Sequence, residues 1–208
     1  KPIDKQLWNI VYSEATAVLP NNTILNLISK AEEPESKPIV MELFRTDEKM
    51  YFRFDNKKIN YLYTNGVIDF ERQPDKETGK LEYFAKFSCP FVQKRLFNCF
   101  SYEIFEHIGA PYKPFEDLSE SITDTDLYLK NILRRYERYL EKNRDWLLKD
   151  APRRSDMRIY EAIFHFNLYR FVFEFLLSCK ARVYPEFPTG NGKVDLFIFY
   201  QNKKYLIE

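Results

Sequence analysis

The chain has 208 residues, 45% of them apolar and 17% aromatic, which is enough for one large domain or two small ones. Its 32 basic and 31 acidic side chains leave a net charge of +1, so bulk charge favours no particular partner and any nucleic-acid surface must be local. Three widely spaced cysteines are more typical of reduced intracellular thiols than of disulfides or a zinc site. The sequence shows no signal peptide and no apolar run of transmembrane length, so we expect a cytoplasmic protein without a membrane partner.

The first part of the chain predicts short helices. Apolar residues recur at helical spacing over 5–18, and a second helix is expected to be capped by Asn22 or Thr23. Residues 39–44 fit a helix or a strand equally well. A further helix over 57–63 is expected to end at Asn65-Gly66, where glycine can adopt the left-handed stop.

Two predicted strands, 67–71 and 81–87, follow this helix and enclose a polar turn. A helix, an Asn-Gly stop and a two-stranded wing make residues 1–110 resemble a winged-helix module. Many winged helices read DNA through a basic recognition helix. The candidate helix offers only Lys57 and Lys58, so a structural or protein-contact role is favoured over DNA reading.

The middle of the chain predicts two longer helices with a boundary between them. A broad apolar face over 91–108 indicates one helix, which Gly109 ends, and the proline-containing segment 110–121 is typical of a domain boundary. The second helix runs from Thr123 to Leu148. Basic residues recur on it every four positions and form one slanting stripe: Lys130, Arg134, Arg138 and Lys142.

The basic stripe has two interpretations. Nearby acids, namely Glu137, Glu141 and Asp145, could pair with it and leave an ordinary solvated helix face. Alternatively, the stripe follows a nucleic-acid backbone and is continued by further arginines after the helix. These are Arg153, Arg154 and Arg158.

The last fifty residues carry two carboxylates at related positions. Strands are predicted over 194–200 and 204–208, joined by the polar turn Gln201-Asn202-Lys203. A two-residue turn places Asp195 directly opposite Glu208, and a four-residue turn makes them diagonal neighbours on the same face. Two such carboxylates would repel each other in an apolar sheet, so a bound cation or a basic neighbour is expected.

The preceding helix, predicted over 158–179, adds a third carboxylate. Glu161 lies near its start, where the helix dipole favours acids, and His165 lies four residues later on the same face. From its position alone, Glu161 could be an ordinary exposed acid near the helix start. For His165, a structural or supporting hydrogen-bonding role is favoured over metal ligation.

Glu161, the segment 186–195 and the hairpin that leads to Glu208 resemble the PD-(D/E)XK nuclease superfamily. In that pattern a helix carries a glutamate, an aspartate opens a strand after a Gly-rich turn, and a hairpin leads to Glu-x-Lys. The segment 186–195 is most similar to nuclease domains found C-terminal to AAA-type ATPases. One departure is that the sequence stops at Glu208, before the expected lysine.

The two resemblances together imply an α+β chain with a winged-helix-like module over 1–110 and a truncated nuclease-like domain over 120–208. In the second domain, helices are expected to flank a restriction-endonuclease-like mixed sheet. The implied activity is metal-dependent hydrolysis of DNA phosphodiesters, with Asp195 and Glu208 holding Mg²⁺ or Mn²⁺ and Glu161 assisting. DNA contacts are expected from basic residues on and beyond the stripe: Arg134, Arg138, Lys142, Arg153, Arg154 and Lys193.

Two alternatives to a nuclease remain open. The chain could be a non-catalytic regulatory or interaction region of a larger ATPase, whose ATPase domain would precede it on the same chain. It could also be a DNA-binding module without chemistry. Without the lysine, we expect the chain as given to be weak or inactive in cleavage. No cofactor other than the metal is expected, because 190–194 lacks the spacing of a phosphate loop.

Overall fold

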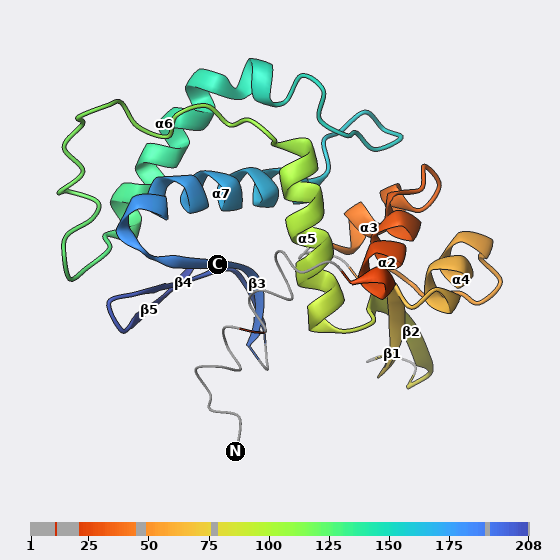
Figure 1. Cartoon of the computed structure of the whole chain (residues 1–208). Coiled ribbons are helices and arrows are strands. Elements are labelled where there is room, and N and C mark those ends of the chain that lie inside the picture. Colours follow the sequence, from red (N-terminus) through yellow and green to blue (C-terminus); the bar gives the residue numbers. More distant parts are fainter. Residues whose placement is uncertain (1–10, 12–20, 45–48, 76–78, 190–191, 208) are drawn as a thin grey trace. The chain divides into compact units, whose positions relative to one another are not determined.

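The structure is a computed structural model that describes residues 11, 21–44, 49–75, 79–189 and 192–207, with the side chains of 186–195 left out (Figure 1). Helices and two antiparallel sheets make it an α+β chain, as expected. It divides into two compact units, Lys1–Cys99 and Phe100–Glu208. This division falls inside α5 (Pro90–Ile104), whereas the sequence suggested a boundary at 110–121.

The first unit begins, in its described part, with two short helices. Asn21 caps α2 by accepting a hydrogen bond of 2.9 Å from the Thr23 amide, so the cap lies one residue before the expected positions. The ambiguous stretch near residue 40 is helical, because Pro38 falls in the first turn, where its missing N–H costs nothing. The elements of this unit are α2 (Asn22–Glu32), α3 (Lys37–Leu43), α4 (Lys57–Thr64), β1 (Ile68–Pro74), β2 (Leu81–Phe87) and the start of α5.

The expected helix and its glycine stop are confirmed in α4. Asn56 caps its start, and Gly66 has a φ of 73°. The Val67 amide donates to the Leu62 carbonyl at 3.0 Å, five residues earlier, which is the Schellman arrangement for ending a helix. The chain therefore turns directly from α4 into the hairpin.

The hairpin β1–β2 is antiparallel, from Ile68↔Phe87 to Pro74↔Leu81. On the side of β2 that faces away from β1, Tyr51 forms an isolated antiparallel bridge with Phe84. Aromatic rings gather between the hairpin and α4, and their centroids are about 5–6 Å apart. This cluster consists of Phe52, Phe54, Tyr63, Phe70 and Tyr83.

In the second unit, α7 (Glu161–Leu176) covers a three-stranded antiparallel sheet in the order β3-β4-β5, and α6 (Leu129–Leu147) packs against α7. Figure 1 shows α7 lying along this sheet, with β3 running back beneath the helix. No strand of this sheet is parallel within the described residues. The elements are α6 (Leu129–Leu147), α7 (Glu161–Leu176), a short 3-10 turn (Leu177–Cys179), β3 (Arg182–Thr189), β4 (Gly192–Tyr200) and β5 (Lys203–Ile207).

Helix α7 is the core of the second unit. It is apolar around most of its circumference, and such a helix is stable only when it is buried. Its stretch Glu161–Cys179 is also long and apolar enough to cross a membrane, and 56% of that stretch is buried inside the unit. That burial is the pattern of a core helix in a soluble domain. Its fully buried apolar side chains are Ala162, Ile163, Phe166, Phe171, Val172, Phe175 and Leu176.

The connection between α5 and α6 is held by side chains on both sides. From the hairpin β4–β5, the Tyr200 hydroxyl donates to the Thr123 carbonyl at 2.7 Å. The Leu127 amide donates to the Tyr205 hydroxyl at 3.1 Å. Because these contacts and the antiparallel bridge between Ile122 and Leu127 hold residues 122–127 in a tight, non-helical turn, α6 begins at Leu129 and not at Thr123, where it was expected.

On the other side of the connection between α5 and α6, Arg135 of α6 donates to the Glu116 carboxylate at 2.5 Å. The Lys113 amide and Arg135 together hold the pKa of Glu116 below its usual value. A carboxyl group with a lowered pKa stabilises the fold above its unfolded-state pKa, and this contribution is lost as pH falls through the folded pKa. The segment should therefore be sensitive to acid.

Replacing Glu116 with glutamine is expected to lower the free energy of unfolding at pH 7 by about 0.5–1 kcal/mol, because the pair is partly solvent-screened. The difference from wild type should shrink as pH falls through the lowered folded pKa of Glu116, and it should vanish once that carboxyl group is protonated. Urea unfolding over a pH series measures it. Glu120→Gln, an exposed change in the same connection, serves as the control, and a pH-independent loss for Glu116→Gln would contradict the assignment.

Candidate functional site

The hairpin β4–β5 has the two-residue turn that the sequence allowed. Gln201 and Asn202 both have left-handed backbone angles, with φ of 47° and 61°. Two successive positive φ values are characteristic of the tight turn that matches strand twist. The pairing runs from Tyr200↔Lys203 to Leu196↔Ile207, which confirms the register expected for this turn length.

In this register, the pair that would follow Leu196 and Ile207 consists of the two predicted metal ligands, Asp195 and Glu208. Asp195 lies in β4, but its side chain is outside the described residues, and Glu208 is outside them entirely. The side chain of Lys193 is outside them as well. The approach of the two carboxylates therefore stays a prediction, supported by a register that stops one pair short of them.

Glu161 is the first residue of α7, close to the predicted helix start. Its Oε1 lies 3.5 Å from Nε2 of His165, one helical turn later, and the two side chains are 33% and 16% exposed. The predicted shared face is confirmed. A half-buried carboxylate at a helix start with an adjacent histidine keeps a defined orientation.

The donor set suits a hard cation, since Mg²⁺ and Mn²⁺ prefer carboxylate oxygens. Within the described part of the chain, no three His, Cys, Asp or Glu side chains come together as a metal site. Glu161 is the one proposed metal-site carboxylate whose surroundings are described. A site would therefore have to be completed by Asp195 and Glu208.

The basic stripe on α6 is exposed to solvent at Lys130, Arg134, Arg138 and Lys142. The opposite side of the helix is buried at Ile132, Tyr139 and Leu147. Among the described residues, no carboxylate lies within ion-pair distance of the stripe. Asp145 instead lies 3.7 Å from the neighbouring Arg144. The interpretation in which ion pairs neutralise the stripe is therefore not supported in this part of the chain.

The arginines after α6 make more contacts within the protein than the basic residues of the stripe do. Arg154 and Arg158 each lie within 4 Å of the Asp156 carboxylate, at 3.9 and 3.8 Å. Arg153 donates to the Met157 carbonyl at 3.2 Å, and a bridge pairs it with Ile159. These contacts shape the turn into α7, so this segment is less free to bind phosphate than the stripe.

Reversing the charge of Arg134 and Arg138 together is expected to weaken duplex DNA binding at least about tenfold at low salt, since two phosphate contacts become repulsive. The slope of log affinity against log salt should fall by about 2. Fluorescence anisotropy over a salt series measures both quantities. Reversal of Lys113 and Lys180, exposed but off the helix, is the control, and equal affinity of all three proteins would reject the stripe as a DNA contact.

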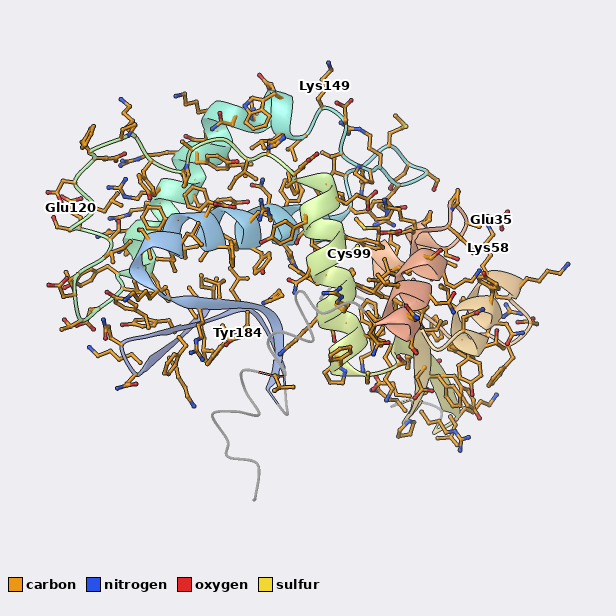
Figure 2. All side chains as sticks on the ribbon, viewed as in Figure 1. Glu35, Lys58, Cys99, Glu120, Lys149 and Tyr184 are labelled. Carbon is orange, nitrogen blue, oxygen red and sulfur yellow. The ribbon has the colours of Figure 1, made fainter. Side chains whose placement is uncertain are left out.

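The first unit contains a hollow of about 550 Å³ between the α2–α3 turn and α4. Its rim carries opposite charges, with Lys58 Nζ 3.6 Å from a Glu35 carboxylate oxygen. Figure 2 shows these two side chains beside each other. The Tyr61 hydroxyl donates to Glu33 at 2.8 Å inside the same hollow. With acids and bases paired in this way, the hollow is poorly suited to phosphate.

Two polar residues of α7 were not singled out in the sequence, although both interrupt an otherwise apolar helix. Asn167 and Arg170 are 0% and 4% exposed. A buried arginine and a buried asparagine one turn apart are unusual in such a helix, and this pattern was visible in the sequence.

Comparisons with protein-family models, with curated proteins and with solved structures found no match to this chain.

Proposed function

We propose that this chain carries a nuclease-like domain that hydrolyses DNA phosphodiesters with a divalent metal ion, as part of a longer, cytoplasmic ATPase-associated protein. One observation carries the proposal. Helix α7 starts with Glu161 and is followed by the antiparallel strands β3, β4 and β5, with Asp195 in the central strand. This is the order of parts in the PD-(D/E)XK pattern that the sequence resembles.

In this proposal the three carboxylates form one metal-binding site. Asp195 and Glu208 would hold Mg²⁺ or Mn²⁺, and Glu161 would complete the donor set with His165 fixing its orientation. When bound, the metal would supply polarisation of the phosphate and a lowered pKa for an attacking water. The PD-(D/E)XK pattern expects a lysine two residues after the glutamate of the hairpin, where it would orient that water and stabilise the developing charge.

The test uses supercoiled and linear DNA with Mg²⁺ or Mn²⁺, and a chain that continues past Glu208 through the lysine position. We expect cleavage by the longer chain, little cleavage by residues 1–208, and none by either in EDTA. Absence of cleavage by the longer chain with both metals and both DNA forms would refute the proposed activity.

The exposed stripe on α6 favours a second candidate, a DNA-binding module without chemistry. One exposed row of basic side chains that make no ion pair within the described part of the chain suits binding along a nucleic-acid backbone. Binding in EDTA with a steep salt dependence, together with no cleavage under any metal condition, would support this candidate over the first.

For the first unit, we propose a winged-helix-like module that contacts protein. The order α4, glycine stop and hairpin supports this layout. Its helix presents Lys57 and Lys58 at the start and apolar or aromatic residues afterwards. A helix with so few basic residues is better suited to a protein surface, such as an ATPase domain of the same longer chain, than to the major groove.

A further inference from the structure

The core of the second unit contains a polar cluster that the proposed nuclease site does not use. Asn167 and Arg170 lie one turn apart on α7, and they are 0% and 4% exposed. Both amide atoms of Asn167 and Nη1 of Arg170 lack a hydrogen bond of normal length and angle to any group in the described part of the chain, although the Asn167 side chain approaches the Tyr139 hydroxyl. Buried polar groups in proteins almost always have a partner.

The guanidinium of Arg170 cannot turn to find another partner, because its other contacts fix it. Nε donates to the Phe105 carbonyl at 3.2 Å, and Nη2 lies 3.3 Å from the Glu174 carboxylate. The group also lies 3.8 Å from the centre of the Tyr102 ring. Nη1 is therefore held in place as a donor inside the core.

A third polar group approaches the same place from α6. The Tyr139 hydroxyl donates to the Ile108 carbonyl at 2.8 Å, which leaves its oxygen lone pairs free to accept. Burial raises the pKa of Tyr139 to about 12, while the Asn167 amide and the Arg170 charge act in the opposite direction. The Tyr139 ring also packs against Phe171, the residue after Arg170 on α7, with ring centroids 4.8 Å apart.

The chemistry of the cluster restricts what can bind there. Arg170 already has the Glu174 carboxylate, so a second anion would be repelled, and the guanidinium opposes a cation. A neutral molecule that both donates and accepts fits Asn167, Nη1 and the tyrosine oxygen together. Globular proteins hold roughly one buried water per 27 residues, each with about three hydrogen bonds, so such a water would be ordinary in this chain.

We propose that a single structural water molecule is bound inside the second unit, where it joins Asn167 and Arg170 of α7 to Tyr139 of α6. It links two helices through polar groups that neither helix satisfies alone. This water site is independent of the proposed nuclease activity.

The first test is a water-selective NOE experiment on the isotope-labelled chain. A long-lived water should give a cross-peak to the side-chain amide protons of Asn167. The amide of Asn143 is the control, because it is half-buried and already bonded to the Tyr139 carbonyl and to Trp146, so it should give none. Absence of the Asn167 cross-peak would overturn the proposal.

The second test is the isosteric change Asn167→Leu. If water bridges the cluster, leucine removes its partner and leaves Nη1 unsatisfied, and the melting temperature should fall by about 4–8 °C. If the amide has no partner in the native protein, leucine removes a desolvated polar group without loss and the melting temperature should rise. A rise would overturn the proposal, and the NOE measurement decides the case if the variant does not fold.

Discussion

Replacing Asp195 with alanine should reduce metal-dependent DNA cleavage by at least about 100-fold in a chain that continues past Glu208, because the site would lose a central ligand of its cation. DNA binding in EDTA should change little, since the basic stripe on α6 is untouched. Initial rates of plasmid nicking over a Mg²⁺ or Mn²⁺ series measure the effect. Partial recovery at high metal concentration is expected if the loss is one of metal affinity.

The matched control is Asp150→Ala, which removes an exposed carboxylate after α6 and should leave the cleavage rate unchanged. Glu161→Gln should give an intermediate loss, because its carboxylate is proposed to complete the donor set. Equal cutting by the wild-type and Asp195→Ala proteins would exclude the assigned site even if both proteins cut DNA.

Replacing Arg170 with alanine should lower the free energy of unfolding by about 2–4 kcal/mol, since three contacts disappear at a buried position. The Phe105 carbonyl, just after α5, loses its donor, the Tyr102 ring loses its cation, and a cavity opens beside α7. Glu174 is 31% exposed and can be resolvated, so it adds little to the loss. Urea denaturation followed by circular dichroism measures the change.

Arg170→Met separates packing from polarity in the same experiment. Methionine fills much of the space above the Tyr102 ring but cannot donate to the Phe105 carbonyl, so its loss should be smaller than that of alanine. Losses of the same size would mean that hydrogen bonding, not packing, dominates at this position. A loss below about 0.5 kcal/mol for both variants would contradict the structural role.

Elements with strong local signals were predictable from the sequence. The stop of α4 at Gly66 and the turn at residues 201–202 follow from backbone preferences that act over two or three residues. The exposed stripe on α6 follows from its four-residue period alone. These features depend little on the rest of the chain, which is why a single sequence predicts them.

Elements that depend on tertiary contacts were not predictable. Strand β3 contains Pro185 and Pro188, which argue against a strand, and it is tolerated because it lies at one edge of the described sheet. The start of α6 is delayed because Tyr200 and Tyr205, more than seventy residues later, bind the backbone of the preceding turn and keep it out of the helix. The candidate site was predictable as a pairing register and as a Glu161–His165 face, whereas the joining of the three carboxylates depends on parts outside the described residues.

The contacts from the hairpin to the segment before α6 also affect how the second unit can open. A long connection without regular structure is ordinarily the first place where a protease cuts. Here the Thr123 carbonyl and the Leu127 amide are bonded to tyrosines of β4 and β5. Exposing this segment to cleavage therefore requires breaking bonds to the sheet as well. The connection and the hairpin β4–β5 should gain and lose protection of their amides from hydrogen exchange together, as one cooperative folding unit.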